Sequence, residues 1–218
     1  MKKYNVNRSR AGNIVSWVLS LIMIAAGVAL IASFFLAGRL DSTATNSDNP
    51  GGFNVPKLET TKDENTSSAG PADKTLELTV PAMSRIENDD IPYAGGTDEE
   101  ALKTHAAIHL EGTGFPWQRE ANVYIAGHRL GYPNTESWLT FWDLDDVGVG
   151  DEIFVTDSKG TKYTYKVFKT FVVSPSDTHV TDTESGKNIL TLQTCTLPDY
   201  KQRLIVRSEL IDTQEKKA

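Results

Sequence analysis

Two hydrophobic patterns divide this chain of 218 residues. From Ile14 to Ala37, 24 consecutive residues carry no charge. As a helix this run would be about 36 Å long, enough to cross the hydrocarbon core of a bilayer. From Leu76 to Ile211, short runs rich in Val, Ile, Thr, Tyr and Phe lie between turn residues, which is typical of β-strands. These runs are 76–80, 106–110, 122–127, 151–157, 161–173, 188–195 and 203–210.

The rest of the pattern after Leu76 also indicates a mainly β fold. Helical periodicity is weak and confined to 97–106 and 136–144, where we expect one or two short helices. The turn residues "DSKG" at Asp157–Gly160 predict a hairpin between two of the strands. Strands this closely spaced over about 135 residues predict a barrel or sandwich with a single core.

Charge is distributed unevenly around the uncharged run. Four Lys and Arg residues precede it within the first ten positions, whereas an acidic and polar stretch follows Arg39. Basic residues remain on the cytoplasmic side of a membrane, so the pattern predicts a single-pass protein of the cell membrane with everything after Leu40 outside the cell. A cleaved signal peptide is the alternative, although its hydrophobic run would be shorter, at roughly 7–15 residues.

Composition changes again before the first predicted strand. Residues 41–75 are rich in Ser, Thr, Asn, Asp, Pro and Gly, with too few large apolar side chains to offset the entropy of ordering them. We therefore predict a basic cytoplasmic N-terminus at 1–12, a transmembrane anchor at 13–38, a flexible extracellular linker at 39–75, a β domain at 76–213 and a C-terminal tail at 214–218.

The charge of the predicted β domain limits the classes of partner that it is expected to bind. The whole chain has a formal net charge of −7, and residues 76–218 hold 14 Lys and Arg against 23 Asp and Glu, a net charge of −9. Phosphate binding needs a basic surface, so nucleic acid is not an expected partner. General attraction to anionic lipid or wall polymer is also excluded as the domain's mechanism.

Cys195 is the only cysteine in the chain, which excludes an intramolecular disulfide and a cysteine-rich metal site. It ends a predicted strand in which alternation places Thr191 and Gln193 on its own face, and Leu190 and Leu192 on the other. A lone cysteine is often a small core hydrophobe, and that role remains open. The more polar surroundings of Cys195 favour a reactive thiol.

The next predicted strand carries two arginines, Arg203 and Arg207, on one face. Seven loop residues separate Cys195 from Arg203. In an antiparallel pair this spacing puts the Arg203 guanidinium near the sulfur. Arg207 is the alternative for the same stabilising role, and Thr194 is a further candidate through its hydroxyl or its backbone.

A nucleophilic thiol needs a proton acceptor or an ion-pair partner, and the chain offers four histidines. His128 follows the apolar run "VYIAG", so it lies at the end of a strand where a glycine lets the backbone turn. His105 and His109 are compatible with half-buried strand positions, and His179 falls in a polar loop. Position alone favours His128 without excluding the others.

Metal and cofactor sites are not expected. The acidic stretch "DLDDVGVGDEIF" from Asp143 departs from a calcium-binding EF-hand loop, because Val147 and Phe154 occupy its fifth and twelfth positions. His105 and His109 have no third ligand at a suitable spacing. We therefore assign no metal and no cofactor.

Three segments together resemble the signature segments of the sortases, a family of membrane-anchored cysteine transpeptidases. They are "NVYIAGHR" ending at Arg129, "TLQTC" ending at Cys195 and "RLIVR" beginning at Arg203. The order of His, Cys and Arg and the anchor-then-linker layout also agree. The longer segments around them are most similar to the housekeeping-type class E sortases of Gram-positive bacteria.

The resemblance implies a closed eight-stranded β-barrel and a complete reaction. Cys195 would attack the carbonyl between Thr and Gly of an LPxTG-like or LAxTG-like sorting signal and form a thioester. His128 would protonate the leaving amine and deprotonate the incoming one, and Arg203 would hold the substrate backbone or the oxyanion. Thr194 and Arg207 are the further substrate-binding candidates. The implied partners are surface proteins that carry the sorting signal and the amine of a peptidoglycan precursor.

Two other functions use the same residues differently. A secreted cysteine peptidase or wall hydrolase would employ Cys195 and His128 but release its acyl group to water. A non-catalytic wall-binding module would keep Cys195 as packing.

Overall fold

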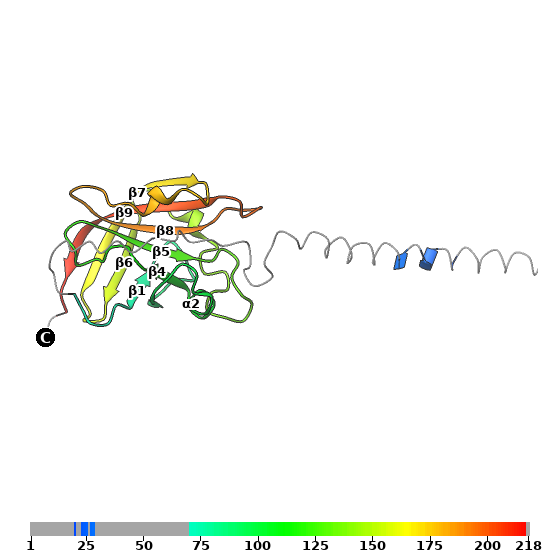
Figure 1. Cartoon of the computed structure of the whole chain (residues 1–218), viewed down its shortest axis with the longest axis horizontal. Coiled ribbons are helices and arrows are strands. Elements are labelled where there is room, and N and C mark those ends of the chain that lie inside the picture. The colour runs from blue at the N-terminus through cyan, green and yellow to red at the C-terminus, as the bar shows by residue number, and fades with distance from the viewer. Residues whose placement is uncertain (1–19, 21–22, 26, 29–69, 217–218) are drawn as a thin grey trace, which may run out of the picture. The chain divides into compact units, whose positions relative to one another are not determined.

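A computed structural model of the chain describes residues 20, 23–25, 27–28 and 70–216 (Figure 1). The chain divides into two units, Met1–Ser47 and Asp48–Ala218. The described residues of the first unit are helical. No helix within the described ranges is both long enough and apolar enough to cross a membrane. Most of the predicted anchor at 13–38, most of the linker at 39–75 and all of the N-terminus at 1–12 lie outside the described residues.

Residues 70–216 form a β-barrel built from one nine-stranded sheet. Its strands are β1 Leu76–Thr79, β2 Asp89–Ile91, β3 Tyr93–Ala94, β4 Ala107–Leu110, β5 Ala121–Gly127, β6 Glu152–Asp157, β7 Lys162–Val173, β8 Asn188–Cys195 and β9 Arg203–Gln214. They are hydrogen-bonded in the order β2-β1-β6-β7-β9-β8-β5-β4-β3. All seven strands expected from the hydrophobic pattern are present.

Short helices connect some of the strands. The α-helix α2, Glu99–Thr104, begins where the Asp98 side chain accepts a hydrogen bond from the Ala101 N–H. It confirms the helix expected at 97–106. The second stretch, 136–144, forms turns that lead into the 3-10 helix η3, Leu144–Asp146. Another 3-10 helix, η4 Thr178–Thr181, lies between β7 and β8.

The strand count differs from the expected eight because one segment is split at Pro92. β2 and β3 flank this residue and form the two edges of the sheet, β2 against β1 and β3 against β4. Proline has no N–H to donate to a ladder, which divides residues 89–94 into two short strands. The Pro92 carbonyl still accepts from the His109 N–H at 2.9 Å. The segment therefore bridges both edges and nearly closes the barrel.

Alternation along the strands separates two hydrophobic clusters. The larger cluster takes residues from every strand except β3, and it fills the barrel interior with side chains such as Ile125 and Leu192. The smaller cluster includes Tyr124, Ile205 and Cys195 together with residues of α2 and the η4 region. Neighbouring residues of a strand point to opposite faces, so this second cluster lies on the outer face of β5, β8 and β9.

Candidate active site

Cys195 and Arg203 face each other across a strand pair. Cys195 is the last residue of β8 and Arg203 the first of β9, and the two are direct partners in the antiparallel register. The register thus pairs Cys195 with Arg203, as the antiparallel arrangement of the two predicted strands requires. Both side chains are 2% exposed. A thiol and a cation therefore share a buried position at the end of the ladder.

His128 is brought to the same place by a parallel strand. β5 pairs with β8 in parallel, with Ala126 opposite Gln193. Figure 1 shows β5, β8 and β9 side by side. The carboxyl ends of parallel strands lie at the same edge of a sheet. Two positions beyond this pair, the chain reaches His128 after β5 and Cys195 at the end of β8, so these two residues lie side by side.

Gly127 makes the position of His128 possible. A Cβ on this residue would lie 2.9 Å from the Phe141 ring, closer than real contacts allow. The Gly127 carbonyl accepts a hydrogen bond from the Thr194 hydroxyl at 2.8 Å, and the His128 carbonyl accepts from the Phe141 N–H at 3.2 Å. The backbone at the end of β5 is therefore fixed on both sides of the histidine.

Burial sets the protonation of the two reacting groups. It raises the pKa of the Cys195 thiol, although the positive charges of Arg203 and Arg129 partly oppose the shift. Burial also lowers the pKa of His128 to about 4. Both shifts favour the uncharged forms near neutral pH. For the Cys195 and His128 pair, burial thus opposes a resting thiolate–imidazolium ion pair.

The Arg203 guanidinium is oriented by the loop that links β8 to β9. Its Nη1 donates to the carbonyls of Tyr200 and Gln202, both at 3.1 Å. Tyr200 has a φ of 57°, in the left-handed region. These contacts hold the guanidinium at the start of β9, across the ladder from the thiol.

The other three histidines lie elsewhere. His109 is fully buried in β4, where a ring nitrogen lies 2.8 Å from the Gly114 carbonyl. His105 ends α2 and contacts Thr104. His179 lies in η4 beside Asp182, and that pair is exposed. Of the four, the structure brings only His128 to the end of β8.

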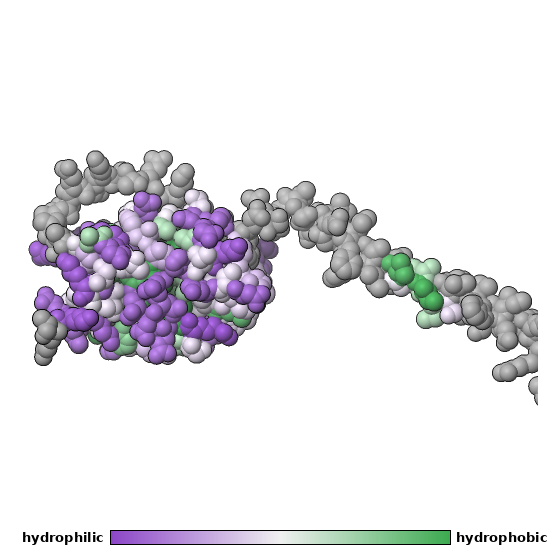
Figure 2. Space-filling model, turned by 90° about the horizontal axis from the view of Figure 1, so that it is seen from below, coloured by the Kyte–Doolittle hydropathy of each residue, from purple (hydrophilic) through white to green (hydrophobic). Residues whose placement is uncertain are grey.

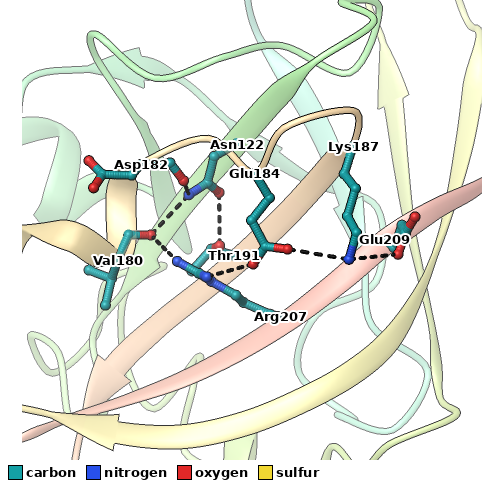
Figure 3. Close-up of polar contacts among 8 residues, drawn as sticks. All are labelled: Asn122, Val180, Asp182, Glu184, Lys187, Thr191, Arg207 and Glu209. Atoms are coloured by element: carbon teal, nitrogen blue, oxygen red, sulfur yellow. Dashed lines mark hydrogen bonds and ion pairs between the residues drawn. The ribbon is translucent and has the colours of Figure 1, made fainter.

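Two further candidate residues have structural contacts of their own. Thr194 is fully buried, and its hydroxyl donates a hydrogen bond to the Gly127 carbonyl on the face opposite Cys195. Arg207 lies on the same face of β9 as Arg203 but donates to Glu184 at 2.8 Å and to the Val180 carbonyl at 3.0 Å (Figure 3). The structure therefore brings together Cys195, His128 and Arg203, and it places Thr194 and Arg207 in other contacts.

Arg129 and Tyr132 also surround the site, and sequence reasoning gave them no role. Arg129 is 4% exposed, donates to Asp145 at 2.6 Å and lies over the Trp142 ring. Tyr132 packs edge-on against the His128 ring with centroids 5.6 Å apart and donates to Glu99 at 3.0 Å. The only feature of the sequence that could have identified them as site residues is their closeness to His128 in the chain.

The arrangement supplies the parts of acyl transfer. Cys195 is a nucleophile, His128 exchanges a proton, and Arg203 is a cation placed where negative charge would develop. In the part of the chain that the structure describes, no three His, Cys, Asp or Glu residues gather in a way that would hold a metal ion.

Comparisons with known proteins agree with this chemistry. A family model for the sortase domain matches residues 78–211. The chain is 25% identical over 229 residues to Sortase A of Streptococcus agalactiae serotype III (strain NEM316), covering 93% of this chain and 87% of that protein.

Solved structures show the same likeness. The chain is similar to a Clostridium perfringens Sortase D5 transpeptidase, with 30% identity, a TM-score of 0.53 and coverage of 63% of this chain and 79% of the other. For Streptococcus pneumoniae Sortase C the identity is 27%, the TM-score 0.56 and the coverage 68% and 74%. The family match spans more than half of the chain, and the chain thus belongs to the sortase family of cysteine transpeptidases.

Proposed function

We propose that this sortase cleaves an LPxTG-like or LAxTG-like sorting signal between Thr and Gly and joins the released protein to an amine of the cell wall. One observation carries the proposal: Cys195 lies opposite Arg203 at the end of β8, and His128 directly follows the neighbouring parallel strand β5. A nucleophile, a proton carrier and a cation thus meet at a single point.

The first half of the reaction forms a thioester. Burial favours the uncharged forms of both groups, and the thiol proton passes to the imidazole as the sulfur attacks the Thr carbonyl carbon. The C–N bond to Gly then breaks, and the imidazolium returns the proton to the leaving amine. The products of this half are a Thr thioester on Cys195, a free peptide that begins with Gly, and a neutral His128.

The second half reverses these roles with a different amine. A wall amine attacks the thioester carbonyl and gives a proton to His128 as the new amide bond forms. The sulfur leaves and takes the proton back. In both halves Arg203 faces the oxygen that becomes negative, and a cation already in place there stabilises the transition state more than the ground state.

We also propose that residues 13–38 anchor the enzyme in the cell membrane, with the barrel on the extracellular side. The 24-residue uncharged run and the basic residues before it support this placement. Met23, Ile24 and Val28 are large apolar side chains that are exposed within the first unit. Figure 2 shows the described part of this unit mainly in the green of hydrophobic residues, whereas most of the barrel face in that view is hydrophilic.

The proposed partners follow from this placement. They are surface proteins that carry the sorting signal and a peptidoglycan precursor that supplies the amine. The segments "GTGFPWQREANVYIAGHRLGYP" and "TCTLPDYKQRLIVR" support the class E assignment within the family.

An assay of product partition tests the proposal. The full-length protein in detergent is incubated with LPxTG-like and LAxTG-like peptides, with and without a glycine-based amine. We expect an amide product that forms only with wild-type protein and amine. Equal peptide consumption with and without amine, and no amide, would identify a hydrolase. No consumption and no labelling of Cys195 by a thiol reagent would identify a non-catalytic wall-binding module.

A further inference from the structure

Residues 174–184, in the connection between β7 and β8 and here termed the η4 segment, fold back on the outer face of the barrel. It contains η4, and its Val180 belongs to the same buried cluster as Cys195, Tyr124 and Ile205. The η4 segment therefore lies on the face that carries the thiol. Polar side chains from two different strands also contact it.

Asn122 of β5 is the first of these contacts. Its side chain is fully buried, and its Nδ2 donates to the Val180 carbonyl at 2.9 Å and to the Asp182 carbonyl at 3.0 Å. Its Oδ1 accepts from the Thr191 hydroxyl of β8 at 2.8 Å. Both amide hydrogens and the amide oxygen are thus used, which fixes the orientation of the side chain (Figure 3).

Arg207 of β9 is the second contact. Its Nη2 donates to the same Val180 carbonyl at 3.0 Å, and its Nη1 donates to the Glu184 carboxylate at 2.8 Å. The Arg207 side chain is 13% exposed, so this ion pair is largely shielded from water. The Val180 carbonyl accepts from both anchors, and Figure 3 shows Asn122 and Arg207 converging on it.

We propose that Arg207 and Asn122 are positioning residues that hold the η4 segment as a preformed wall of the peptide-binding face. The inference rests on the proposed transpeptidase function and deepens it. A wall that is already ordered does not have to be ordered when the peptide binds, so its effect is on affinity. Arg207 accordingly acts through the η4 segment and does not contact the reacting carbonyl.

Lys187 provides a matched control within the same network. Its Nζ lies 3.3 Å from Glu184 and 3.5 Å from Glu209, and its side chain is 38% exposed. Exposed ion pairs of this kind contribute little. Lys187→Met removes one positive charge, as Arg207→Met does, but leaves the Val180 carbonyl with both donors.

Hydrogen exchange and kinetics of the full-length protein in detergent test the proposal together. In Arg207→Met and Asn122→Asp we expect amide exchange in the η4 segment to rise about tenfold or more, as for the loss of a charged or buried hydrogen bond. The KM for the sorting peptide should rise by about tenfold while kcat changes less than about threefold. Lys187→Met should change neither quantity. If Arg207→Met does not fold, Glu184→Gln tests the same anchor by removing only the charge of the acceptor.

Each of the other outcomes would overturn one specific part of the proposal. Unchanged exchange in the η4 segment in both anchor variants would contradict the positioning role. A fall in kcat with unchanged exchange would instead assign Arg207 to transition-state stabilisation. If the wild-type protein does not process any sorting peptide, the proposed function fails, and faster exchange in the variants would still establish the anchor.

Discussion

Two arginines on one face of β9, four positions apart, differ in what surrounds them. Arg203 lies opposite Cys195, is 2% exposed, and donates to two backbone carbonyls. Arg207 lies opposite Thr191 and forms an ion pair with Glu184 at 2.8 Å. The two residues have the same side chain and the same orientation on the strand, so their neighbours determine their roles.

Arg203 and Arg207 differ in the group with which their positive charge interacts. The charge of Arg207 is balanced by a carboxylate from the η4 segment, so it stabilises a local arrangement. The charge of Arg203 acts on the Cys195 thiol, opposing the effect of burial on its pKa. A cation beside a nucleophile stabilises the negative charge of an oxyanion that forms there. The neighbours of each arginine on β9 therefore determine its role. Strand alternation alone does not predict that role.

Substituting each arginine by lysine is the strongest way to break this comparison. An ammonium does not reproduce the planar guanidinium fork. Arg203→Lys should lower kcat by about a hundredfold or more, the usual cost of removing an oxyanion contact. Arg207→Lys should act mainly on KM. Steady-state kinetics of the two full-length variants in parallel measure the difference, and equal losses of kcat would remove the distinction between the two sites.

Two buried histidines allow a second, smaller comparison. Burial lowers the pKa of both His128 and His109 to about 4, although only His128 lies at the site. The ordinary value is about 6.5, so the unfolded chain takes up these protons first as the pH falls. The stability lost between about pH 6.5 and pH 4 is on the order of 3 kcal/mol for each histidine.

Urea unfolding of the full-length protein at pH 7 and pH 4.5 measures this loss. His109→Gln should lose less stability on acidification than the wild type, because glutamine keeps a donor for the Gly114 carbonyl but does not titrate. The same pH dependence in both proteins would show that His109 contributes nothing to acid sensitivity.

The sequence predicted the features of the site that depend on local periodicity. Alternation and a seven-residue loop were enough to place Arg203 opposite Cys195, and the register confirms this placement. Alternation also placed Cys195 away from Leu190 and Leu192, and these leucines lie in the interior cluster while Cys195 lies in the outer one. Both inferences needed only neighbouring residues and a strand period of two.

Other features depend on partners that are distant in the chain. β5 and β8 pair in parallel across more than sixty positions. Position in the sequence favoured His128 without excluding the other histidines, and the family resemblance was needed to place it beside Cys195. Segment 89–94 was missed because proline interrupts a very short strand that the sheet nevertheless uses to bridge its edges. The contact of Arg207 with Glu184, 23 positions away, is likewise invisible to periodicity.

Trapping the acyl-enzyme tests the central claim most directly. The full-length protein is mixed with a sorting peptide in the absence of amine, quenched in acid and digested, and the fragment that contains Cys195 is weighed by mass spectrometry. We expect a mass increase equal to the peptide up to and including its Thr, lost on addition of amine and absent in Cys195→Ala. Peptide cleavage without any adduct on Cys195, or cleavage that persists in Cys195→Ala, would contradict it.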